Sequence, residues 1–96
     1  MNLGYYATLR EITGRSQEPW NSSTETVGDL LRDLSARYGQ NFKRWVLEED
    51  GSLGQMCIIL VNGRDVRELD RLMTRLHPED SISFFPPVAG GERRTR

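Results

Sequence analysis

Hydrophobic and polar residues alternate over the start of the chain. One side of an extended chain would carry Leu3, Tyr5, Ala7 and Leu9. This period of two predicts a half-buried strand over residues 2–10, followed by a turn at Gly14. A second strand is predicted over residues 18–24 and would pair antiparallel with the first. Because Pro19 cannot donate a ladder hydrogen bond, it limits that strand to the edge of the sheet or to an irregular start.

Helical spacing replaces the alternation after Thr26. The apolar residues of this stretch are Val27, Leu30, Leu31, Leu34 and Tyr38. Their spacing predicts a helix with one apolar stripe, which we expect to face a sheet. Thr26 is a candidate N-cap, and Asp29 would lie near the positive end of the helix dipole. Gly39 is a typical residue at the end of a helix.

Residues 40–55 give the least regular pattern in the chain. Their apolar residues are Phe42, Trp45, Val46 and Leu47. These indicate a short helical turn or an irregular packed segment. Residues 48–51 are predicted to form an acidic turn, and residues 51–54 an exposed loop. The carboxylates of the turn lack EF-hand spacing, so we expect them to be solvated rather than to bind a metal ion.

The next stretch predicts a strand, a tight turn and a returning strand. Residues 56–61 are apolar throughout, which favours a strand in the middle of the sheet. Asn62-Gly63 follows as a tight turn, because both residues tolerate a positive φ, and residues 64–66 would return as a short strand. A loop with one brief helical turn is expected to pack beneath the sheet through Leu69, Leu72, Met73 and Leu76.

The last predicted strand covers residues 81–85. Alternation places Ile82 and Phe84 toward the core and Phe85 on the opposite face. Tyr6 would also point outward from the first strand. If these two strands are neighbours, Tyr6 and Phe85 form an aromatic patch on the face away from the helix. Exposed aromatic side chains of this kind often mark a docking site.

Composition narrows the class of protein. The 96 residues suit one domain, and 36% apolar with 28% charged residues is the balance of a soluble globular chain. The net charge of −1 gives no indication of a nucleic-acid partner. We find no secretory signal pattern after Met1, and the longest apolar run is far below the roughly 18 residues of a membrane span. We therefore expect a cytoplasmic protein that binds neither nucleic acid nor membrane.

Cys57 and His77 are the single cysteine and the single histidine of the chain. Cys57 lies in an apolar run, so we expect a buried small hydrophobe in a protein from a reducing compartment. His77 precedes Pro78 and has no second histidine or nearby cysteine, which favours a surface turn over a metal site. Because no pair of titratable groups stands at catalytic spacing, we expect no active site of its own.

Strands on both sides of one long helix predict a small α+β domain of sheet and helix. A distinctive segment then leaves the last strand. It consists of Pro86, Pro87, Val88, Ala89, Gly90 and Gly91. The prolines favour an extended chain, and the glycines allow the backbone to enter a narrow passage. A carboxylate at Gly91 would be unhindered, so a partner enzyme could activate it as an acyl-adenylate.

Three segments of the sequence resemble the small sulfur-carrier subunit of molybdopterin synthase, a ubiquitin-like protein related to the thiamin sulfur carrier. These segments are residues 5–14 (YYATLREITG), 61–66 (VNGRDV) and 84–91 (FFPPVAGG). They look like the family's first strand and turn, its central hairpin and its end. The resemblance implies a ubiquitin-like β-grasp domain over residues 1–91, with a mixed sheet of four to five strands packed on one main helix.

The resemblance also implies a chemistry that other proteins carry out on this chain. An ATP-using, E1-like partner would adenylate Gly91, and a sulfur donor would convert it to a thiocarboxylate. The carrier itself would bind no cofactor. It would dock through Tyr6 and Phe85 on the large catalytic subunit of the synthase, which inserts the sulfur into a pterin precursor of the molybdenum cofactor. Related carriers serve thiamin, cysteine or transfer-RNA thiolation, so the acceptor stays open.

Residues 92–96 depart from the family pattern, in which the glycine pair ends the chain. With this extension, Gly91 forms an amide bond where the chemistry needs a free carboxylate. We expect this extension to be disordered. Three explanations stay open: a tail-processing protease removes the extension, the extension is not native, or the protein does not carry sulfur.

Two other functions are compatible with the sequence. In the first, the protein is a modifier that is joined through Gly91 to lysines of target proteins, and the arginine-rich extension is a removable cap. Lys43 is the only lysine of the chain, so chains of linked copies would have few attachment sites. In the second, the protein is a plain interaction domain whose tail is never activated.

Overall fold

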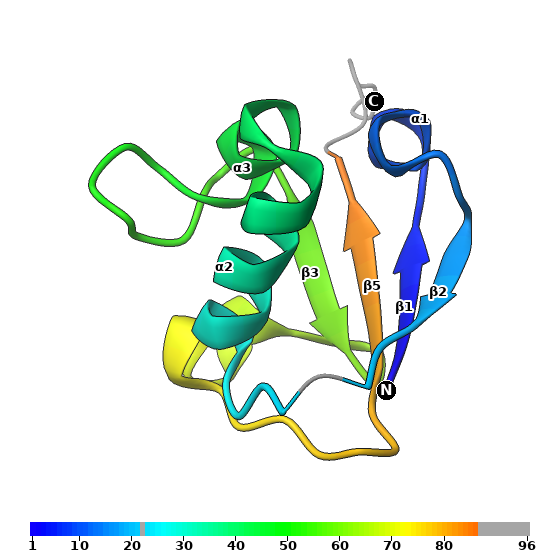
Figure 1. The fold of residues 1–96 in the computed structure, drawn as a ribbon. Coiled ribbons are helices and arrows are strands. Elements are labelled where there is room, and N and C mark those ends of the chain that lie inside the picture. The colour runs from blue at the N-terminus through cyan, green and yellow to red at the C-terminus, as the bar shows by residue number, and fades with distance from the viewer. Residues whose placement is uncertain (22, 87–96) are drawn as a thin grey trace, which may run out of the picture.

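The structure, a computed structural model, describes residues 1–21 and 23–86 (Figure 1). Its elements are β1 (Asn2–Tyr5), α1 (Thr8–Thr13), β2 (Gln17–Pro19), α2 (Val27–Tyr38), α3 (Gln40–Val46), β3 (Ile58–Val61), β4 (Arg64–Asp65), the 3-10 helices η1 (Val66–Glu68) and η2 (Arg71–Met73), and β5 (Ser81–Phe85). Within these residues one five-stranded sheet has the order β2-β1-β5-β3-β4. β1 and β5 run parallel, and the other neighbours run antiparallel. The predicted α+β class with a mixed sheet is confirmed.

The main helix forms as the sequence predicts. Thr26 has an extended backbone, and its Oγ1 accepts a hydrogen bond from the backbone N–H of Asp29 at 3.2 Å. A cap of this kind stabilises a helix by about 1 kcal/mol. At the other end, Gly39 has φ 86° and ends α2. The apolar stripe of α2 is buried in the core, and its buried residues are Val27, Leu30, Leu31 and Leu34.

The first strand is shorter than the alternation predicts. β1 ends at Tyr5, and Ala7 then has φ 54° and ψ −125°, which turns the chain into α1. Leu9 is fully buried, but it reaches the core from a helix rather than from a strand. The prediction of a strand over residues 2–10 is therefore wrong beyond Tyr5. Residues 5 and 9 are an even number of positions apart and also one helical turn apart. Their spacing therefore fitted a strand and a helix equally well.

The second strand is also shorter than predicted. β2 covers Gln17–Pro19 and pairs antiparallel with β1 at the edge of the sheet, as Pro19 requires. The predicted strand over residues 18–24 is wrong after Pro19. Trp20, the next residue, is buried in the core. The predicted turn at Gly14 is confirmed, since this residue ends α1 with φ 80°.

The hairpin in the middle of the chain is confirmed. Asn62 and Gly63 have φ values of 52° and 85°, and they join β3 to β4. β4 is one residue shorter than predicted, because Val66 already belongs to η1. β3 has a neighbour on each side, but the central strand of the sheet is β5.

The segment after α2 is more ordered than the sequence indicates. α3 is a helix over Gln40–Val46, as one of the two alternatives predicted. The prediction of an exposed loop over residues 51–54 is wrong in its second half, where Leu53 and Gly54 are buried. A Cβ at Gly54 would lie 2.9 Å from the carbonyl carbon of Val46. The loop therefore packs closely on the end of α3 and requires glycine there.

The loop between β4 and β5 packs on the domain only in part. Leu76 is buried, and Leu69 and Leu72 pack against the core from its margin, as predicted. Met73 is 71% exposed, so the prediction that it packs beneath the sheet is wrong. Two short helices, η1 and η2, replace the single predicted helical turn. No helix among residues 1–21 and 23–86 has both the length and the apolar character that a membrane span needs.

Candidate functional site

The tail of the chain leaves the domain from the centre of the sheet. β5 is paired with β1 on one side and with β3 on the other, and its pairing continues to Phe85, which lies opposite Ile58. The chain is therefore held in place up to the last residue of β5. Pro86 follows and is half-buried. The other predicted tail residues, Pro87, Val88, Ala89, Gly90 and Gly91, lie outside the described residues, so their roles stay predictions.

The structure brings Tyr6 and Phe85 together at the start of the tail. Their rings are stacked with centroids 4.2 Å apart and planes 11° apart, and Tyr6 is 44% exposed. The Tyr6 backbone N–H donates a hydrogen bond to the Phe84 carbonyl, which fixes this residue beside β5. The Tyr6 ring lies over Gly4, where a Cβ would be 3.4 Å from the ring. The predicted aromatic patch thus exists, and its docking role stays a prediction.

Ile58 extends this patch across the sheet. It lies opposite Phe85 in the β3–β5 pair and is 40% exposed. Its neighbours Cys57 and Ile59 are buried, so β3 alternates although all of its residues are apolar. Ile58 was not identified from the sequence, because the unbroken apolar run was interpreted only as a strand in the middle of the sheet. We call Tyr6, Ile58 and Phe85 the outer patch.

A second aromatic pair lies directly behind the outer patch, on the buried face of the sheet. The Tyr5 and Phe84 rings have centroids 5.6 Å apart, and Phe42 of α3 packs against both rings. All three side chains are almost completely buried. The last residues of β5 are thus fixed from inside by the core, while Phe85 on the opposite face is only half-buried.

Glu18 of β2 anchors this inner pair and is only 1% exposed. Its Oε1 accepts hydrogen bonds from the Tyr5 hydroxyl at 2.7 Å and from the Tyr38 hydroxyl at 2.6 Å. Its Oε2 lies 3.2 Å from Arg37 Nη1 and 3.7 Å from Arg15 Nη1. Burial, with the adjacent Glu18 carboxylate, raises the pKa of Tyr5 far above its usual range, and the pKa of Tyr38 is raised for the same reasons.

Both tyrosines therefore stay protonated as donors, and one carboxylate ties β1, β2 and α2 together. Glu18 was not identified from the sequence. Its partners come from Tyr5 and from the far end of α2, and only the fold brings them to one place.

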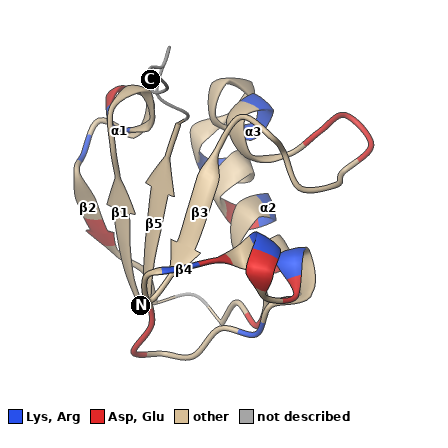
Figure 2. Cartoon of the chain, turned by 180° about the vertical axis from the view of Figure 1, so that it is seen from behind, with Lys and Arg blue, Asp and Glu red and all other residues tan. Residues whose placement is uncertain are grey.

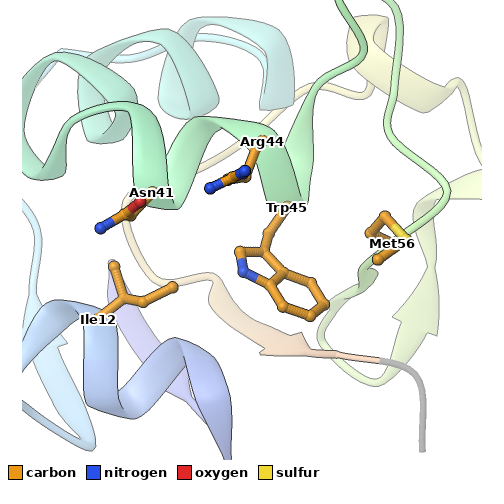
Figure 3. A pocket seen from close by; sticks show the side chains of 5 residues that line it. All are labelled: Ile12, Asn41, Arg44, Trp45 and Met56. Atoms are coloured by element: carbon orange, nitrogen blue, oxygen red, sulfur yellow. The ribbon is translucent and has the colours of Figure 1, made fainter. Parts of the chain in front are cut away.

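A shallow hollow lies beside the start of the tail, between α1 and α3. It has a volume of 310 Å³ and is lined by Ile12, Asn41, Arg44, Trp45 and Met56. Figure 3 shows Trp45 reaching from α3 into the space between Ile12 and Met56. α1, α3 and the end of β5 all lie at the end of the molecule where the tail begins (Figure 1). Apolar surface therefore flanks the start of the tail on both sides of the sheet.

The single cysteine and the single histidine lie where the sequence predicts. Cys57 is buried, and this burial raises the pKa of its thiol to about 12, so the thiol is protonated at neutral pH. His77 is exposed on a turn, with Nδ1 3.6 Å from a carboxylate oxygen of Asp80. In the part of the chain that the structure describes, no three His, Cys, Asp or Glu side chains group as a metal site would require.

Comparison with known proteins places this geometry in a family context. The sequence model of the ThiS family matches residues 3–91. Small archaeal modifier protein 3 of Haloferax volcanii is 41% identical over 92 residues, which are 95% of this chain and 98% of that protein. The sulfur carrier protein CysO of Mycobacterium tuberculosis is 36% identical over 84 residues, which are 86% of this chain and 89% of that protein.

Solved structures agree with these matches. Small archaeal modifier protein 1 of Methanosarcina acetivorans has a TM-score of 0.79 and 34% identity, with 94% of each chain covered. A chain of the Amycolatopsis orientalis BexX/CysO complex has a TM-score of 0.75 and 27% identity, covering 94% of this chain and 98% of that one. The predicted ubiquitin-like β-grasp fold is confirmed by these neighbours together with the strand order.

Proposed function

The chain belongs to the ThiS family of ubiquitin-like sulfur carriers, and we propose that it carries sulfur as a thiocarboxylate on Gly91. The observation that supports this most is the place where the tail begins. A central strand, fixed on both sides, ends beside the exposed outer patch and continues into a Gly-Gly segment. The family match reaches residue 91 and leaves residues 92–96 outside it, which supports Gly91 as the working end.

The proposed chemistry needs partners that supply ATP and sulfur. An activating enzyme joins the Gly91 carboxylate to AMP and releases pyrophosphate from ATP. Sulfur from a donor then replaces AMP at the carbonyl carbon and leaves a thiocarboxylate. Pro86 and Gly91 are five positions apart, so a fully extended arm would span about 17 Å from the domain. This reach lets the carbonyl enter a partner's active site while the outer patch stays on the partner's surface.

The sulfur acceptor is the finer part of the proposal. The resemblance to the small subunit of molybdopterin synthase favours a pterin precursor, delivered through a larger catalytic subunit. The name of the CysO relative points to a sulfur carrier without naming that acceptor. The cytoplasmic location stays a prediction. Restoring molybdopterin synthesis in cells that lack their own small subunit, with the chain ending at Gly91, would test the acceptor directly.

Intact mass spectrometry of the protein from its natural host tests the carrier function. We expect a species that ends at Gly91 and a second species heavier by the exchange of one oxygen for one sulfur. A Gly91→Ala variant provides the control, because it keeps a carboxylate but adds a methyl group at the reacting residue. If only full-length protein is found and it remains active, the carrier proposal is wrong and a plain interaction domain is favoured.

A second candidate function rests on one specific observation. The relative with 41% identity over nearly the whole chain is named a small archaeal modifier protein. A modifier would be joined through Gly91 to lysines of other proteins, and it would use the same activation by ATP. The two functions differ in the fate of the acyl group: conjugates of higher mass with glycine remnants on target lysines favour the modifier, and a free thiocarboxylate favours the carrier.

A further inference from the structure

The chain carries very few amines that could react with an activated carboxylate. Of its 13 basic residues, Lys43 is the one lysine and the others are arginines. The arginine guanidinium stays protonated in proteins and is not a nucleophile at neutral pH, whereas a lysine amine becomes one when it loses its proton. Almost all of the positively charged side chains of this sequence are therefore unreactive toward acyl groups.

The only other amine of this sequence is the α-amino group of Met1. The Met1 amino group donates a hydrogen bond to the Trp20 carbonyl at 3.1 Å, and Met1 is half-buried. The N-terminus also lies at the end of the sheet opposite to the start of the tail (Figure 1). This amine is thus engaged by the fold.

Lys43, in contrast, is exposed on α3 at the tail end of the molecule. Its chain neighbour Phe42 packs against Phe84 of β5 with ring centroids 6.0 Å apart, which fixes the helix beside the end of that strand. Lys43 lies in a shallow hollow of 480 Å³ with Gln40, Arg44 and Glu49. Figure 2 shows the basic residues on α3 beside the acidic loop that follows it.

This hollow suits a thin peptide tail. Arg44 offers N–H donors for the carbonyl oxygens of an incoming chain, and Glu49 offers an acceptor for its amide N–H groups. An exposed hollow admits a Gly-Gly segment, which has no side chains to exclude.

We propose that Lys43 is the acceptor amine through which one copy of this protein is joined to the activated Gly91 of another. The neutral amine attacks the Gly91 carbonyl carbon of the acyl-adenylate and forms a carbon–nitrogen bond. The bond from that carbon to the phosphate oxygen breaks, AMP leaves with the electron pair, and the nitrogen loses one proton to water. This step rests on the activation of Gly91 in the proposed function, and it uses the same ATP-derived intermediate.

The test uses a donor that is activated chemically, so it needs no activating enzyme. The donor is the chain ending at Gly91 as a thioester, with Lys43→Arg to remove its own lysine. The acceptor is the full chain, in which Gly91 is blocked by residues 92–96. A second acceptor carries K43R, which keeps the charge and removes the nucleophilic amine. Equal melting temperatures of the two acceptors establish that both are folded.

We expect a linked species with the native acceptor, a branched peptide that joins Gly91 to Lys43 in its digest, and loss of both with the K43R acceptor. Equal yields with the two acceptors, attachment at the Met1 amine, or no linked species with the native acceptor would overturn the proposal. These outcomes do not depend on whether the proposed carrier function is correct. The thioester supplies the activated Gly91 carbonyl that a partner enzyme would otherwise make. Conversely, failure to find a modified Gly91 in the natural host would leave this result unchanged.

Discussion

Two tyrosine–phenylalanine pairs on opposite faces of the sheet make different contributions to this molecule. Tyr5 and Phe84 face the core, with ring centroids 5.6 Å apart. Tyr6 and Phe85 follow them directly in the sequence and lie on the other face, where Tyr6 is exposed and Phe85 is half-buried, with ring centroids 4.2 Å apart. Burial of the inner pair removes apolar surface from water when the chain folds. The outer pair leaves apolar surface in water, and that surface becomes stabilising only when a partner covers it.

Position in the sheet, rather than residue type, decides here whether an aromatic pair stabilises the fold or is available for docking. The inner pair is joined to Glu18, whose carboxylate accepts hydrogen bonds from Tyr5 and Tyr38. The outer pair is continued by Ile58 and adjoins the start of the tail. Substitutions of the inner pair should therefore change stability, and substitutions of the outer pair should change partner binding.

The largest expected difference is between the two phenylalanines. Phe84→Ala leaves a cavity in a fully buried site, and we expect it to lower the free energy of unfolding by about 3–5 kcal/mol. Phe85 is half-buried, so Phe85→Ala should lower it by clearly less, about 1 kcal/mol. Urea unfolding followed by circular dichroism measures both values. Similar losses in the two variants would contradict the division between the faces.

Glu18 provides the next largest effect. Glu18→Ala leaves the Tyr5 and Tyr38 hydroxyls and the Arg37 guanidinium without their acceptor, and we expect a loss of about 2–4 kcal/mol in the free energy of unfolding. Glu49→Ala serves as a matched control, because Glu49 is an exposed carboxylate on the loop after α3. If the two variants unfold at the same urea concentration, Glu18 does not anchor the inner pair.

Alkaline pH should weaken the inner pair selectively. The pKa of Tyr5 is raised in the folded state, so above the ordinary tyrosine pKa of 10.0 the unfolded chain loses a proton that the folded chain retains. The contribution of Tyr5 to stability is therefore complete below about pH 10 and falls as the pH rises further. Urea unfolding curves measured from about pH 8 to about pH 11, a range that spans the ordinary tyrosine pKa, should show this fall in the free energy of unfolding.

Two variants identify the source of that pH dependence. Tyr5→Phe should reduce the slope above the ordinary tyrosine pKa, because it removes one of the two hydroxyls that donate hydrogen bonds to Glu18. Tyr6→Phe is the matched control on the exposed face and should leave the slope unchanged. A slope that responds equally to both substitutions would remove Tyr5 from this explanation.

The smallest effect concerns the residue that ends the first strand. Ala7 has φ 54° and ψ −125°, a backbone conformation that favours glycine. Ala7→Gly should raise the free energy of unfolding by about 0.5–1 kcal/mol, after the larger entropy of glycine in the unfolded chain is included. Thermal unfolding compares this variant with Ala36→Gly in α2, where glycine is expected to lower stability. An equal loss in both variants would indicate that Ala7 is not strained.

Local patterns predicted the outer pair and the main helix. Alternation in residues 81–85 was enough to place Phe85 outward, and Thr26 and Gly39 set the limits of α2. The tight turn at Asn62-Gly63 was predictable for the same reason, because its conformation depends on two adjacent residues. Such features need no knowledge of distant contacts.

Features that depend on distant contacts were not predictable. The spacing of Leu9 fitted a strand and a helix equally well, and the unusual conformation of Ala7 decided between them. Glu18 appeared to be an ordinary residue of a weak strand, because its partners Tyr5, Tyr38 and Arg37 lie elsewhere in the sequence. Ile58 was missed because an apolar run does not reveal that one face of β3 is left uncovered.

The most direct test of the account is the mass of Gly91-terminated protein isolated from its own cells, compared between the native chain and Phe85→Ala. We expect a thiocarboxylate on the native chain and its loss in Phe85→Ala, while both proteins remain folded and equally abundant. A Phe85→Ala protein that carries as much thiocarboxylate as the native chain would contradict the claim that the outer patch docks the partner. Absence of a thiocarboxylate from the native chain would contradict the carrier function itself.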